Sequence, residues 1–145
     1  MNAILLCAAA LSMIHTQDDR RNTCMELVEI SERVGVPPHI VVATAMVETR
    51  MNKDAVSPAG AVGALQILKR WHCKEECDPE EVGVHLLYRL RIKYKSWEEA
   101  WCHYSAGTKC TDRGRKYAQK VRSWVFRFWT LPIPLDEGIR PPRKL

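Results

Sequence analysis

The sequence predicts a compact all-α domain with one irregular loop near its centre. Apolar residues recur at helical intervals in several segments, and proline, glycine or capping residues separate these segments. No segment is rich in β-forming residues, and there is no internal repeat. The chain of 145 residues is 46% hydrophobic and 27% charged, which is typical of a globular protein with one core and excludes a largely disordered chain.

Residues 1–21 are predicted to form a separate N-terminal segment. An uncharged apolar run over 3–14 is followed by four charged residues at 18–21. About a dozen apolar residues suit the core of a signal peptide and are too few to span a bilayer. However, no Lys or Arg precedes the run, and no small-x-small cleavage site clearly follows it. We expect export, and a retained helix packed on the domain is the alternative.

The main domain, residues 22–130, is predicted to begin with two helices. Apolar residues recur at helical spacing over 22–34, and Gly35 ends the run. A Pro-Pro pair then opens a helix over 40–50, since proline is tolerated in the first helical turn. This helix is apolar on almost all sides, so it belongs in the middle of the domain.

The rest of the domain is predicted to be a loop followed by four helices. Residues 52–63 are rich in Gly, Ala, Ser and Pro, which is typical of a loop. Asp78 and Ser96 stand at helix starts, where their side chains can cap free backbone N–H groups. The expected helices span 64–71, 78–95, 96–107 and 115–129, and a Pro-rich basic tail covers residues 131–145.

Charge and cysteine content restrict the function classes. A net charge of +5 favours an acidic partner, which peptidoglycan, nucleic acid and anionic membranes all provide. We expect no nucleic-acid partner, because no helix carries a basic face beyond one group of four cations. These four cations are Arg89, Arg91, Lys93 and Lys95. We also expect no membrane span.

Six cysteines in so short a chain favour an oxidising compartment. We predict a disulfide between Cys102 and Cys110, which bracket a short turn. The sequence leaves the other pairings open. A zinc site is the alternative, but C-x-x-x-C is not a usual zinc-ligand spacing. Its ligands would be Cys73, Cys77, Cys102 and Cys110, with His72 or His103 as a further candidate. We therefore expect no metal and no cofactor.

Glu48 is the candidate general acid, because it lies one turn from the end of the most apolar helix. Burial of a carboxyl raises its pKa and keeps it protonated near neutral pH, as a general acid requires. The alternative is that Glu48 lies on an exposed helix end and pairs with Arg50 or Lys53.

Three ordered blocks of sequence accompany this acid. The first runs from Ala-Met-Val-Glu-Thr around Glu48 through a Ser-Pro-Ala-Gly-Ala-Val-Gly-Ala-Leu-Gln loop that ends at Gln66. The second is His-Tyr-Ser-Ala-Gly at 103–107, and the third is Tyr117 followed by Val121. In order and spacing, over residues 24–129, these blocks resemble the Slt-type lytic transglycosylases, a family related to goose-type lysozyme.

The resemblance implies a lysozyme-like helical fold with a Gly/Ser/Ala-rich active-site loop. It also implies a lyase that cleaves the MurNAc–GlcNAc β-1,4 bond of peptidoglycan glycan strands without consuming water. Glu48 would protonate the glycosidic oxygen and then deprotonate the muramoyl C6 hydroxyl, leaving an anhydromuramoyl end. The predicted substrate-binding residues are Ser57, Gly63, Gln66, Tyr104, Ser105 and Tyr117.

This chain departs from the family pattern at several positions near the expected site. Thr49 replaces Ser, Ala64 replaces Leu, and Leu65 replaces Met, the last of which conserves volume. Ser105 replaces Asn and drops an amide donor, which leaves the substrate contact there open.

Several alternatives remain on the sequence alone. Asp54, in the loop, could act as a second carboxylate in a two-acid glycosidase. A hydrolytic goose-type lysozyme could use the same scaffold. The domain could also be docked in a virion or secretion apparatus through the leader or the tail. The expected location is periplasmic, secreted or packaged in a virion, where the enzyme would open the wall for a phage genome or a secretion machine.

Overall fold

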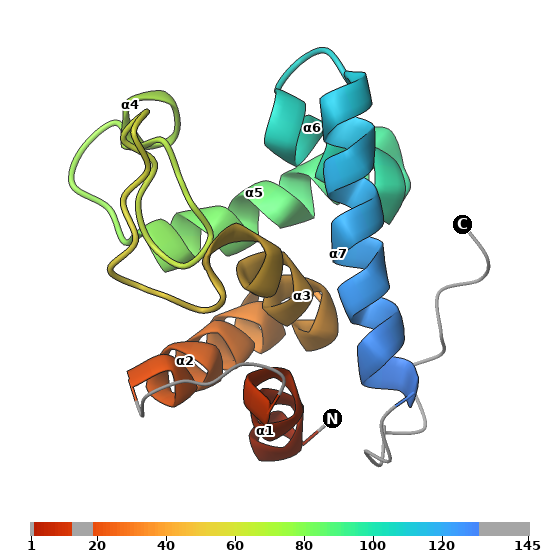
Figure 1. The fold of residues 1–145 in the computed structure, drawn as a ribbon. Helices are drawn as coiled ribbons and strands as arrows, with labels where there is room; N and C mark the ends of the chain where they lie inside the picture. Colours follow the sequence, from red (N-terminus) through yellow and green to blue (C-terminus); the bar gives the residue numbers. More distant parts are fainter. Residues whose placement is uncertain (1, 13–18, 131–145) are drawn as a thin grey trace.

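The computed structural model describes residues 2–12 and 19–130 and confirms the predicted all-α domain. Within these residues no strand is longer than an isolated bridge. The predicted tail at 131–145 lies outside the described residues. The helices are α1 (Ala3–Ser12), α2 (Asp19–Val34), α3 (Pro38–Thr49), α4 (Lys69–His72), α5 (Pro79–Tyr94), α6 (Trp97–Ala106) and α7 (Asp112–Thr130) (Figure 1).

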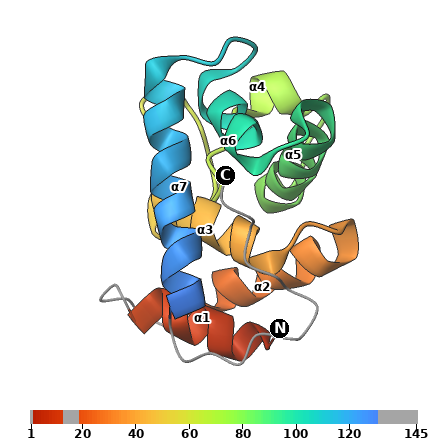
Figure 2. The same cartoon turned by 90° about the vertical axis from the view of Figure 1, so that its right-hand side faces the viewer.

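Helix α3 lies at the centre of the molecule, as its apolar sequence predicts. It packs against α1, α2 and α7, and every residue from His39 to Met46 is buried. Helix α7 runs along one side, from α6 at one end to α1 at the other (Figures 1 and 2). Helix α5 packs against both α2 and α6. An apolar helix needs neighbours on all its faces, and this arrangement supplies them.

The predicted caps of two helices are confirmed. The carboxylate of Asp78 accepts a hydrogen bond from the backbone N–H of Glu80 (3.0 Å), and the hydroxyl of Ser96 accepts one from Glu99 (3.1 Å). Gly107 ends α6, also as predicted. Its φ of 82° is a left-handed conformation that glycine adopts without the steric cost of a side chain.

The predicted helix over 64–71 is wrong, because only Lys69–His72 forms helix. Residue 62 instead pairs with residue 67 in both directions: each backbone N–H donates to the other's carbonyl, at 3.0 and 2.9 Å. Gln66 has a φ of 54°, which lies outside the right-handed helical region. The backbone groups that a helix would need are therefore used to close a tight, strand-like loop.

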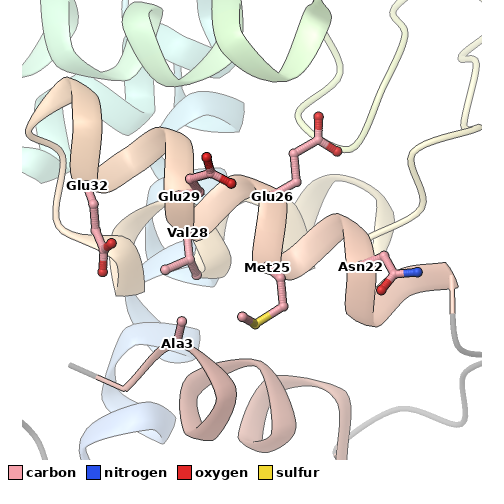
Figure 3. Close-up of a pocket in the computed structure, with 7 residues that line it drawn as sticks. All are labelled: Ala3, Asn22, Met25, Glu26, Val28, Glu29 and Glu32. Atoms are coloured by element: carbon pink, nitrogen blue, oxygen red, sulfur yellow. The ribbon is translucent and has the colours of Figure 1, made fainter.

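Helix α1 is packed into the core. Leu6, Cys7 and Ala10 are buried, and α1 contacts α2, α3 and α7. Cys7 forms a disulfide with Cys24 of α2. In the hollow between the two helices, Met25 and Val28 point from α2 toward α1 (Figure 3). Among the described residues, no helix is long and apolar enough to cross a membrane.

All six cysteines are paired. The predicted Cys102–Cys110 disulfide is present and closes the turn between α6 and α7. Cys73 forms a disulfide with Cys77, just after α4. The four cysteines of the zinc alternative are thus disulfide-bonded, and disulfide sulfurs do not ligate zinc as thiolates do.

Candidate active site

Glu48 lies in the last turn of α3 and is largely buried. Burial raises the pKa of its carboxyl from 4.5 to about 7, and a hydrogen bond from Tyr117 opposes part of that rise. The alternative in which Glu48 pairs with Lys53 or Arg50 is not found. Lys53 pairs with Glu26 at 2.7 Å, and Arg50 forms the left-handed cap of α3.

Tyr117 of α7 donates a hydrogen bond from its hydroxyl to Glu48 Oε1, at 2.6 Å. Burial, together with the nearby Glu48, raises the pKa of Tyr117 far above its ordinary value, so the hydroxyl remains a donor over the whole physiological range. The hydrogen bond occupies Oε1. Oε2 accepts no hydrogen bond from the described residues, so the proton of the neutral acid resides on Oε2.

Tyr104 of α6 stacks beside Tyr117, with ring centroids 6.4 Å apart and planes 12° from parallel. Its hydroxyl donates to the carbonyl of Leu65 at 2.5 Å. This bond ties α6 to the loop. Tyr104 therefore lines the site with its ring while its polar end supports the loop.

Gln66 holds the loop closed from within. Its side-chain nitrogen donates to the carbonyls of Ala55 (3.1 Å) and Gly63 (3.0 Å). Because both partners are acceptors, the nitrogen and oxygen of this amide can be told apart. The amide oxygen has no partner among the described residues and is free to accept a hydrogen bond from a ligand. Ser57 closes the other turn of the loop, since its hydroxyl accepts from the N–H of Ala61 at 3.0 Å.

Glu80 is a site-supporting residue that sequence reasoning missed. It is 1% exposed, and its Oε1 accepts a hydrogen bond from the backbone N–H of Ala64 at 2.8 Å. Burial raises its pKa. In the sequence, Glu80 looks like an ordinary surface acid in the first turn of a capped helix. Only the tertiary structure reveals the role of Glu80, because the loop lies over its side chain.

Gly63 lies against Glu80 and does not line the cleft. Gly63 is predicted from the sequence to bind substrate, but the close approach that it permits is to protein. A Cβ at this position would lie 2.5 Å from Glu80 Oε1 and 3.0 Å from the Cβ of Pro79.

Gly63→Ala is expected to lower the free energy of unfolding by about 2–5 kcal/mol. A left-handed φ of 83° costs a non-glycine residue about 1–2 kcal/mol, and overpacking against Glu80 adds about 1–3 kcal/mol. Gly60→Ala is the matched control, because Gly60 has a φ of 88° and open space around its missing Cβ. Urea denaturation of both variants measures the difference. Equal losses would show that the contact with Glu80 is not restrictive.

A cleft of about 570 Å³ opens in front of Glu48. It brings together all the predicted site residues except Gly63. Asp54, the candidate second carboxylate, lines a different hollow beside Arg20, so Glu48 is the one acid among the described residues that line this cleft. The lining is Glu48, Ser57, Ala59, Ala61, Gln66, Leu68, Tyr104, Ser105, Arg113, Lys116, Tyr117 and Lys120.

The cleft continues into a second hollow of about 660 Å³, with which it shares Leu68, Tyr104 and Ser105. This hollow has an aromatic wall. Tyr94 stacks on His103 with centroids 3.7 Å apart, and Trp71 is 71% exposed beside them. Aromatic faces of this kind pack well against the apolar faces of sugar rings.

The arrangement combines a buried carboxyl of raised pKa, a tyrosine donor and an open groove, which together suit acid-catalysed cleavage of a polymer. The comparison with curated proteins finds no match to the chain. The family model of the transglycosylase SLT domain matches residues 27–126, which include α3, the loop and the start of α7 through Tyr117. The chain therefore belongs to the transglycosylase SLT domain family, whose members are peptidoglycan lytic transglycosylases with a lysozyme-like helical fold.

Proposed function

We propose that Glu48 serves as both general acid and general base in cleaving the MurNAc–GlcNAc bond. The observation that carries the proposal is a buried carboxyl with a pKa of about 7 in a cleft whose described lining holds no second acid. At that pKa both the acid and the carboxylate are accessible near neutral pH, so one residue can perform the two proton transfers in turn.

In the first step, the proton on Oε2 of Glu48 passes to the glycosidic oxygen, and the C–O bond to the muramoyl C1 breaks. Positive charge develops at C1, and the substrate's own N-acetyl group stabilises it, in place of a second carboxylate. The hydrogen bond from Tyr117 stabilises the carboxylate that forms.

In the second step, the Glu48 carboxylate removes the proton of the muramoyl C6 hydroxyl, and the C6 oxygen bonds to C1. The glucosamine unit leaves with its new hydroxyl, and the muramoyl unit becomes the 1,6-anhydro form. Glu48 is again protonated, and no water is consumed.

Ser57, Gln66, Tyr104 and Ser105 are proposed to hold the sugars. The free amide oxygen of Gln66 can accept a hydrogen bond from an N-acetyl N–H or a hydroxyl group. Ser105 is exposed and lies where the cleft and the second hollow join. Its short hydroxyl reaches less far than the amide of the Asn that is usual in this family.

The polymeric substrate and the three disulfides fit an extracytoplasmic location. Within that, we propose a periplasmic or secreted enzyme that opens the wall locally for a phage genome or a secretion machine. A virion-packaged form that docks through the N-terminal segment or the tail is the variant of this proposal.

Mass spectrometry of the muropeptides released from purified peptidoglycan tests the chemistry. We expect anhydromuramoyl ends in place of reducing ends. Incubation in ¹⁸O-labelled water provides the control, because a lyase leaves the label out of the product whereas hydrolysis incorporates it. Labelled reducing ends as the main product would instead show a hydrolytic, goose-type muramidase.

A further inference from the structure

Three cations of α7 form a basic stripe along the Glu48 cleft. Arg113, Lys116 and Lys120 all line the cleft. Their spacing of three and four residues places them on one face of the helix. The expectation that no helix beyond residues 78–95 carries a basic face is therefore wrong for α7. Tyr117 lies on the same side and reaches Glu48. We call these three residues the basic rim.

The basic rim is not neutralised by the protein. None of its three side chains forms an ion pair within residues 2–12 and 19–130, whereas Arg115, on the same helix, pairs with Glu99. All three are exposed. Glu48, the one acid in the described lining, is largely uncharged below a pH of about 7. The cleft therefore presents uncompensated positive charge to its ligand.

Charge of the opposite sign gathers elsewhere on the molecule. The hollow between α1 and α2 is lined by Glu29 and Glu32 from α2, together with Glu26, which is paired with Lys53 (Figure 3). The acids and the unpaired cations lie on different surfaces. The positive electrostatic potential at the cleft therefore comes from the local arrangement of charges and not from the net charge of the protein alone. Such a patch raises the local concentration of anions and orients them.

The glycan ring atoms that the reaction uses are uncharged, so the basic rim must serve another part of the substrate. In peptidoglycan the muramoyl unit carries a peptide stem through its lactyl group, and that stem bears free carboxylates. We propose that Arg113, Lys116 and Lys120 bind stem-peptide carboxylates and make the enzyme selective for glycan that still carries charged stems. This inference rests on the proposed function, since it takes peptidoglycan as the ligand of the Glu48 cleft.

Co-sedimentation with purified sacculi tests the proposal. The binding protein carries Glu48→Gln, so no cleavage occurs and the result does not depend on the catalytic mechanism. The sacculi are freed of phosphate-containing wall polymers, and a separate batch that retains these polymers is tested in parallel. One half is treated with carbodiimide and ammonium chloride, which converts the stem carboxylates to carboxamides of nearly the same size.

We expect about a tenfold loss of affinity when the carboxylates are converted, from three solvent-exposed ion pairs. The Arg113→Gln/Lys116→Gln/Lys120→Gln variant should lose about the same on untreated sacculi, with no further loss on carboxamide sacculi. The control variant is Arg21→Gln/Lys74→Gln/Arg89→Gln, which changes the net charge equally at exposed positions outside the cleft lining. It should bind as the parent does.

Three outcomes would overturn the proposal. Equal losses in the control variant would show a net-charge effect. An equal effect of the basic-rim substitutions on both kinds of sacculi would show that stem carboxylates are not the ligand. Dependence on the basic rim only for sacculi that retain phosphate polymers would assign it to phosphate. If the Glu48-containing enzyme releases no anhydro products, the proposed mechanism fails, and the binding result still stands.

Discussion

Glu48→Gln is expected to lower turnover on purified peptidoglycan by at least about a thousandfold, within the range that general acid–base groups contribute. The amide has nearly the same shape as the acid but cannot donate the proton to the glycosidic oxygen or accept one from the C6 hydroxyl. The substitution therefore removes both proton transfers. Release of soluble muropeptides measures the loss.

The same substitution is expected to stabilise the fold at alkaline pH. The pKa of Glu48 is raised from 4.5 in the unfolded chain to about 7 in the fold. The folded state therefore binds the proton more tightly, and stability falls as pH rises from about 4.5 to about 7. A shift of this size corresponds to about 3 kcal/mol. Glu48→Gln should unfold at higher urea than wild type at pH 8, and the difference should vanish at pH 4.

Asp54→Asn is the matched control for turnover. Asp54 is exposed and lies outside the Glu48 cleft, so its loss should leave turnover unchanged. A comparable collapse in Asp54→Asn would favour a two-carboxylate glycosidase. Wild-type turnover in Glu48→Gln would overturn the single-acid mechanism outright.

Tyr117→Phe is expected to lower kcat by about ten- to a hundredfold, because a hydrogen bond to a charged group contributes about 1.5–3 kcal/mol. The hydroxyl lowers the pKa of Glu48 by stabilising its carboxylate. Without it, that pKa rises, so the descending alkaline limb of the pH–rate profile should move to higher pH. The acid step should be slowed most, because its product, the carboxylate, loses the hydrogen bond that stabilises it.

The pH–rate profile of kcat for both proteins measures this shift. Tyr104→Phe is the comparison, because its hydroxyl bonds to the carbonyl of Leu65 and not to Glu48. It should loosen the loop and raise KM without moving the alkaline limb. An unchanged limb in Tyr117→Phe would show that the 2.6 Å contact does not tune the acid.

Local sequence patterns were sufficient to predict most of the helices. Asp78 and Ser96 cap their helices as predicted, because a cap involves residues two or three positions apart. The burial of α3 follows from its apolar composition, and with it the raised pKa of Glu48. The ordered blocks around Glu48, Tyr104 and Tyr117 also predicted which distant segments form one cleft.

The sequence by itself thus determined most of the helices, the buried acid and the family. Only the tertiary structure decided how the loop is held and what surrounds the acid. Residues 64–68 have helical composition, yet the N–H of Ala64 donates to Glu80, which is 16 residues away, and the backbone of Ile67 pairs with that of Val62. Whether Lys116 faces solvent or the Glu48 cleft depends on how α7 packs on α3. Such contacts leave no local pattern, because their partners meet only when the chain is folded.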